Sequence, residues 1–90
     1  MKIRITSRFK KGFQRLTLDQ QQVFQKQMEL LSNNPVPPFH PSLRIKKIQG
    51  TSGIFECSIN RDIRLTWQYH QSGYTLLRNI GKHDRTLKNP

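Results

Sequence analysis

The first third of the chain carries hydrophobic residues at helical spacing, after a short alternating segment. Residues 2–6 read KIRIT and alternate between polar and apolar side chains, which predicts a strand. An apolar stripe at i, i+4 and i+7 follows, made of Phe9, Phe13 and Leu16. This spacing predicts a helix over residues 8–15, with Ser7 as its N-terminal cap.

A second helix is indicated by a capping box and another apolar stripe. Thr17 and Gln20 have the spacing of a capping box. The stripe that follows consists of Val23, Phe24, Met28 and Leu31. Asn33 and Asn34 precede Pro35, so the helix is expected to end at these asparagines.

The segment NNPVPPFHPS holds four of the five prolines and is therefore expected to be a stiff connector and not an element. His40 lies inside it and is interpreted as a loop histidine without a role. No apolar run approaches the roughly 20 residues that a membrane-spanning helix needs, and no signal peptide is recognised. We therefore expect a cytoplasmic protein that has no membrane partner.

From residue 43 the pattern changes to a period of two. The predicted strands cover residues 43–48, 54–60, 61–69 and 74–80. Short turns separate them, which favours antiparallel neighbours. The whole chain, residues 1–90, is thus predicted to be one α+β domain: an N-terminal strand, a two-helix hairpin and a small antiparallel sheet with the helices on one face.

Alternation along these strands assigns the two faces of the sheet. The face expected to pack against the helices carries Phe55, Cys57, Ile59, Ile63, Leu65, Trp67 and Tyr69. The opposite face, expected to be polar and open, carries Glu56, Ser58, Arg64, Thr66 and Gln68. Cys57 is therefore interpreted as a core residue and not as a nucleophile, and a single cysteine fits a reducing compartment.

Charge adds a partner class to this picture. The chain has 16 Lys and Arg against 5 Asp and Glu, a net charge of +11. The cations divide evenly, eight in residues 1–45 and eight in residues 46–90, so this is no basic tail on a neutral domain. Such a balance indicates a polyanionic partner: nucleic acid, an anionic membrane or an acidic protein.

The last twelve residues, NIGKHDRTLKNP, place a histidine among cations just beyond the last predicted strand. The three histidines and one cysteine lack metal-ligand spacing, so neither a metal nor another cofactor is expected. The remaining candidates form a cationic group: Lys46, Lys47, Arg61, Arg64, Arg78, Lys82, His83 and Arg85. Metal-free RNA cleavage needs a base for the ribose 2′-OH, cations for the phosphate and an acid for the 5′-oxygen, and histidine and arginine suit these roles.

The ordered set of segments resembles the RelE/ParE superfamily of bacterial toxins from type II toxin–antitoxin systems. The segments are the helical hairpin, the run from Lys47 to Gly50 (KIQG), the run from Arg64 to Trp67 (RLTW) and the ending RNIGKHD. The resemblance implies a RelE-like fold and an acidic antitoxin that covers the basic face in a hetero-oligomer. RelE-like and YafQ-like members cut mRNA in the ribosomal A site, so the ribosome and mRNA are the implied partners.

The resemblance also implies roles for single residues. Gly81-Lys82-His83 is similar to the ending of the YafQ-like branch, which makes His83 a catalytic candidate. Asp62 resembles an acidic site residue of that branch, and Arg64 resembles the arginine that acts on the scissile phosphate. The residues interpreted as binding RNA are Lys46, Lys47, Arg61, Arg78, Lys82 and Arg85.

Three positions depart from the family pattern. RelE-type enzymes carry lysines where this chain has Glu56 and Ser58, and the YafQ-like branch has a histidine at Ser58 and an aromatic residue at Leu87. Two alternatives to an mRNA endonuclease therefore stay open. One is a ParE-like toxin that poisons DNA gyrase, and the other is an RNA- or ribosome-binding module without catalysis.

Overall fold

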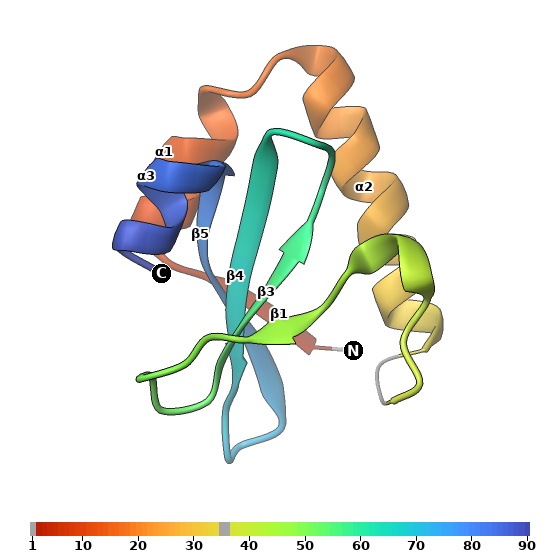
Figure 1. The fold of residues 1–90 in the computed structure, drawn as a ribbon, viewed down its shortest axis with the longest axis vertical. Coiled ribbons are helices and arrows are strands. Elements are labelled where there is room, and N and C mark those ends of the chain that lie inside the picture. Colours follow the sequence, from red (N-terminus) through yellow and green to blue (C-terminus); the bar gives the residue numbers. More distant parts are fainter. Residues whose placement is uncertain (1, 35–36) are drawn as a thin grey trace.

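The computed structural model describes residues 2–34 and 37–90. Along the chain the elements are β1 (Lys2–Ile5), α1 (Ser7–Gln14), α2 (Leu18–Asn33), a 3₁₀ turn η1 (Pro41–Leu43), β2 (Lys46–Lys47), β3 (Ile54–Ser58), β4 (Ile63–Tyr69), β5 (Tyr74–Lys82) and α3 (His83–Lys88), as labelled in Figure 1. The predicted α+β order is confirmed, with two added elements: α3, and the turn η1, which begins in the proline-rich segment that was predicted to hold no element. None of the helices in the described ranges is long and apolar enough to cross a membrane.

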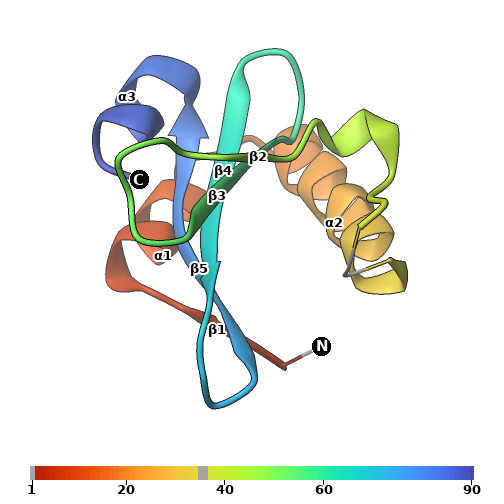
Figure 2. The same cartoon turned by 60° about the horizontal axis from the view of Figure 1, so that its bottom comes forward.

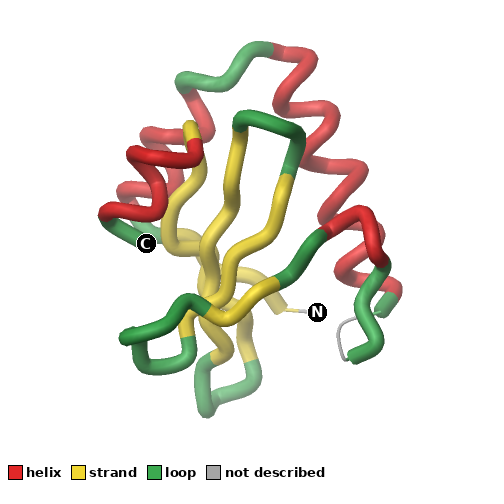
Figure 3. Tube along the Cα trace, in the orientation of Figure 1, coloured by secondary structure: helices red, strands yellow, loops and turns green. Residues whose placement is uncertain are grey.

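The five strands form one mixed sheet in the order β1-β5-β4-β3-β2. The strands β2 to β5 are antiparallel, as their short turns predict. By contrast, β1 runs parallel to β5, and its residues 2–5 pair with residues 74–77. Figure 2 shows β1 beside the hairpin of β4 and β5, and Figure 3 shows helical segments on both flanks of the strands.

The two long helices begin at capping residues. The hydroxyl of Thr6, and not that of Ser7, accepts a hydrogen bond from the backbone N–H of Phe9 at 3.0 Å, so α1 starts one residue earlier than predicted. The capping box of α2 is confirmed by reciprocal bonds of 3.1 and 2.9 Å between Thr17 and Gln20. This helix ends at Asn33 as predicted, while Pro35 lies outside the described residues.

The core lies between the sheet and the pair α1 and α2, where the alternation predicted it. Its fully enclosed members include Leu31, Cys57, Leu65 and Trp67. Trp67 stacks on Phe55 with ring centroids 5.8 Å apart. Two predicted core residues are exposed: Val23, which lies about 100° around α2 from Phe24, and Tyr69, at the end of β4.

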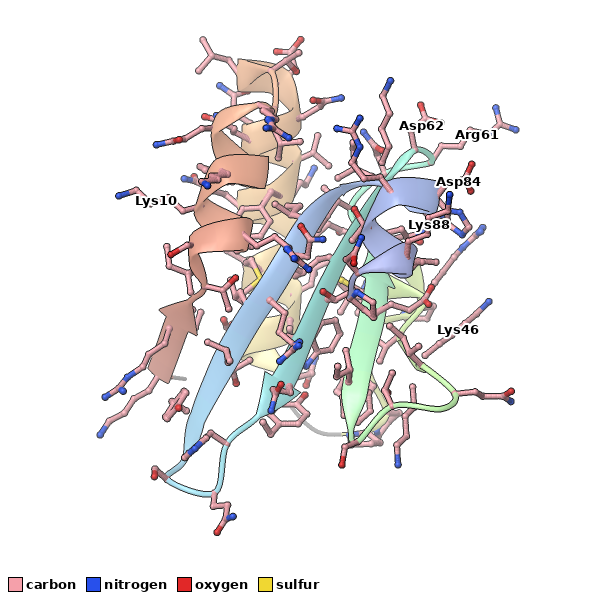
Figure 4. All side chains as sticks on the ribbon, turned by 90° about the vertical axis from the view of Figure 1, so that its left-hand side faces the viewer. Lys10, Lys46, Arg61, Asp62, Asp84 and Lys88 are labelled. Carbon is pink, nitrogen blue, oxygen red and sulfur yellow. The ribbon has the colours of Figure 1, made fainter. Side chains whose placement is uncertain are left out.

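The face predicted to be open is partly covered, because the segment after Gly81 is not a tail. It folds back as α3 and packs on β4 and β5. Figure 4 shows this helix on the side of the sheet opposite to α1 and α2. Thr66, Asn79 and Thr86 are consequently buried between α3 and the strands. Glu56, Ser58, Arg64 and Gln68 of the same face stay partly accessible.

Candidate active site

The ends of β4 and β5 bring the three predicted catalytic residues to one corner of the sheet. The backbone N–H of His83 donates a 2.9 Å hydrogen bond to the carbonyl of Asp62. One step further along the ladder, Arg64 is paired with Gly81, two residues before His83. The tertiary structure thus joins Asp62, Arg64 and His83, which lie up to 21 positions apart in the sequence.

The loop between β3 and β4 is held by Asn60, a residue for which the sequence suggested no role. Its side-chain oxygen accepts hydrogen bonds of 2.8 Å from the backbone N–H groups of Asp62 and Ile63. An asparagine that bonds its own backbone two residues ahead is typical of a fixed turn. Arg61 and Asp62 therefore lie in this loop. The sequence had placed both in the following strand, but β4 begins only at Ile63.

Arg64 is positioned by this same loop. Its Nη1 group donates to the carbonyls of Asn60, Arg61 and Ile63 at 2.9, 3.1 and 3.2 Å. All three bonds use Nη1, which leaves Nη2 and Nε without an acceptor within residues 2–34 and 37–90. The guanidinium is pre-positioned and still has donors for a phosphate oxygen.

The imidazole of His83 is accessible and oriented by its neighbour. The side chain is 50% exposed, and its Nδ1 lies 3.1 Å from Oδ1 of Asp84. A carboxylate on Nδ1 favours the tautomer in which Nε2 is free to accept a proton. Asp84 was not assigned a role from the sequence. Arg61, Asp62 and Asp84 lie on the side of the sheet that faces away from α1 and α2 (Figure 4).

The structure separates the six predicted RNA-binding residues into several groups. Lys46 is paired with Glu56 and shares the partly open face, whereas Lys47 is paired with the core residue Phe55 and points to the opposite face. Arg61 is exposed in the loop beside Asp62. Lys46 and Arg61 thus share a side with the catalytic candidates.

Lys82 and Arg85 flank His83 in sequence but line a different surface. Both line a groove between α1 and α3, which is described below. Arg78 is half-buried and holds the C-terminal segment: its Nε donates to the carbonyl of Pro90 at 3.0 Å, and its Nη1 donates to the side chain of Gln68. In this conformation the Arg78 guanidinium is engaged within the protein.

The remaining candidates for chemistry have structural roles. His40 is no idle loop residue, because its Nδ1 accepts from the backbone N–H of Ser42 at 3.2 Å and caps η1. His70 accepts from Ser72 in the turn before β5 at 3.1 Å. Cys57 is buried in the core as predicted, and this burial raises the pKa of its thiol to about 12. Among the described residues no cluster of three or more His, Cys, Asp or Glu could hold a metal.

Comparison with known proteins identifies the fold. No family model matches the sequence, and no curated protein matches it. Solved structures do match along almost the full chain. The copper-bound mutant toxin of Helicobacter pylori superposes with a TM-score of 0.77 at 22% identity, covering 94% of this chain and 97% of the other.

Two further structures agree. The archaeal RelE–RelB complex of Pyrococcus horikoshii matches with a TM-score of 0.70 at 17% identity, over 93% of this chain and 96% of that one. YafQ of E. coli matches with a TM-score of 0.72 at 18% identity, over 93% and 94% of the two chains. The protein therefore has the fold of the RelE and YafQ toxins.

Proposed function

We propose that this protein is the toxin of a type II toxin–antitoxin system and cleaves mRNA on the ribosome without a metal ion. The observation that carries the proposal is the corner formed by Asp62, Arg64 and His83. The imidazole of His83 is accessible there, and the backbone N–H of His83 donates to the carbonyl of Asp62. Arg64 lies on the adjacent strand. The fold shared with RelE and YafQ supports this choice.

The corner contains groups suited to each step of RNA cleavage. A base removes the proton from the ribose 2′-OH, whose oxygen attacks the adjacent phosphorus. The bond from phosphorus to the 5′-oxygen breaks, and an acid gives that oxygen a proton. We assign one of these proton transfers to His83, with Asp62 as the acidic partner of the site. The free donors of Arg64 stabilise the charge that develops on the phosphate oxygens.

The proposed partners follow from charge and exposure. The net charge of +11 suits the ribosome and mRNA as well as an acidic antitoxin. RelE of P. horikoshii was crystallised with RelB, and YafQ of E. coli with DinJ. An apolar groove on this protein, lined in part by Ile3, Ile5, Phe13 and Phe24, offers a surface for such a protein partner. These partners imply that the protein acts in the cytoplasm.

His83→Ala tests the catalytic assignment. We expect it to reduce cleavage of a translated message by 10²–10⁴-fold or more in primer extension, because it removes the general acid or base. His70→Ala is the matched control, since this exposed histidine lies in the turn before β5 and not at the Asp62 corner. Thermal melting should show that both variants are folded. Parental cleavage by folded His83→Ala would contradict the assignment.

Pulse-labelling after induction separates the classes of toxin. A collapse of protein synthesis is the expected result. A selective collapse of DNA synthesis would instead support gyrase poisoning. This alternative is favoured by Glu56 and Ser58, because with these residues β3 carries no cation. Normal growth in the presence of folded protein would contradict every toxin assignment.

A further inference from the structure

A cationic groove lies at the edge of the sheet, apart from the Asp62–His83 corner. It has a volume of about 480 Å³ and runs between α1 and α3 along the last residues of β5. Beyond Leu77, where the pairing with β1 ends, no described strand covers this edge of β5. Its charged lining residues are Arg8, Lys11, Arg15, Lys82 and Arg85. We call it the α1–α3 groove.

Both walls of the α1–α3 groove carry cations. Arg8 and Lys11 of α1 and Arg15, its C-terminal cap, follow one another at i, i+3 and i+7 and span about 10 Å. Lys82 is paired with Ile63, which faces the helical layer, so its side chain lies on the α1 side of β5. Arg85 completes the second wall from α3.

No protein anion balances these charges. The lining includes neither aspartate nor glutamate, and all five cations are exposed. Within residues 2–34 and 37–90 the structure records a single ion pair, between His83 and Asp84. Five uncompensated cations on two facing walls favour a ligand that carries several negative charges along its length.

The other lining residues indicate what kind of polyanion fits. The groove has no aromatic side chain, so it offers no stacking platform for the unstacked bases of a single strand. Its apolar residues, Leu16, Ile63 and Ile80, are all buried, so none of these side chains projects as an anchor for a protein segment. Cations without aromatic or apolar anchors suit a phosphate backbone read by shape and charge.

We propose that the α1–α3 groove binds the phosphate backbone of helical RNA, separately from the single strand that the His83 site cleaves. The proposal rests on the proposed function for its choice of RNA as the partner. Arg8, Arg15 and Arg85 offer planar forks to phosphate oxygens, and the two lysines add point charges. The groove thereby anchors the protein on folded RNA while His83 acts on another segment.

Charge reversal at two neighbouring residues tests this. Lys11 lines the groove, whereas Lys10 does not and points away from the sheet (Figure 4). Both substitutions, Lys11→Glu and Lys10→Glu, are made in the His83→Ala background, and binding to a blunt RNA duplex is measured at several salt concentrations. We expect Lys11→Glu to weaken binding at least about fivefold more than Lys10→Glu at 0.15 M salt. For Lys11→Glu, the slope of the logarithm of the binding constant against the logarithm of the salt concentration should also become shallower by about 0.7–0.9, the value of one lost phosphate contact.

Equal effects of the two substitutions, or duplex binding that does not change with salt, would overturn the proposal. If Lys11→Glu kept duplex binding but no longer bound an acidic antitoxin, the groove would be a binding site for a protein partner and not for RNA. Because binding is measured in a background that cannot use His83, the result stands whether or not the parent cleaves mRNA. Melting curves of both variants ensure that only folded protein is compared.

Discussion

At the scale of single residues, two glycines determine how closely the helices approach β5. A Cβ atom added at Gly12 of α1 would lie 2.2 Å from the backbone oxygen of Ile80. One added at Gly81 would lie 3.1 Å from the hydroxyl of Thr86 in α3. The first contact is with backbone and cannot be relieved by a rotamer change. Gly12 therefore allows α1 to lie directly against β5, the strand that leads into His83.

Gly12→Ala is expected to destabilise the protein although alanine is the better helix former by about 1 kcal/mol. The new methyl group must push α1 away from β5, and overpacking of this kind typically costs about 1–3 kcal/mol. Urea denaturation measures the free energy of unfolding. Gln14→Ala, an exposed position on the same helix, serves as the control and should change it little. An unchanged or raised stability of Gly12→Ala would disprove the close approach.

At the scale of elements, α3 is too short to be stable alone and depends on tertiary contacts. Arg78 and Asn79 in β5 supply two of them: the first donates to the carbonyl of Pro90 and the second to that of Asn89 at 2.9 Å. Thr86 is buried against the strands. Since α3 begins at His83, whatever holds this helix also holds the catalytic candidate.

Arg78→Ala is expected to loosen α3 because Pro90 and Gln68 lose their donor. Amide hydrogen exchange should become at least about fivefold faster in residues 83–88, in line with the loss of a hydrogen bond from a charged group. Arg61→Ala is the comparison, since Arg61 lies exposed in the loop before β4. If exchange in α3 were the same in both variants, the contacts of Arg78 would not hold this helix.

At the scale of the whole molecule, three surfaces of different chemistry lie at different places. The corner around His83 and the α1–α3 groove are polar and charged. A third surface, between β1, α1 and α2, is an apolar groove of about 730 Å³ in which Ile3 and Ile5 are 42% and 49% exposed. The outer edge of β1 is also unpaired within the described sheet. The negative charges of an acidic protein that covers this apolar groove would also attract the two charged surfaces that we propose to bind RNA.

Ile5→Asp is expected to weaken binding of the cognate antitoxin by about tenfold or more, because it places a charge in the apolar groove and repels an acidic partner. Val23→Asp introduces the same charge at an exposed apolar residue outside this groove and should have a much smaller effect. Isothermal titration calorimetry gives both affinities. Equal losses would mean that the antitoxin is sensitive only to net charge and does not use the groove.

Local sequence signals determined most of the elements. The capping box at Thr17, the alternation through Trp67 and the short turns are interactions between near neighbours, so they can be read without the fold. The same alternation placed Cys57 and Leu65 correctly in the core. The order of the two long helices and of the later strands, and the position of Arg64 on the polar face, followed from these patterns alone.

Only the tertiary structure decided which distant segments meet. The parallel pairing of β1 with β5, the return of α3 over Thr66 and the groove between α1 and α3 all join segments with no shared local pattern. For the same reason Lys82 and Arg85, neighbours of His83 in sequence, lie on another surface, and Arg78 holds the C-terminal segment. A side chain's role here depends on which face of β5 it occupies and on which helix covers that face.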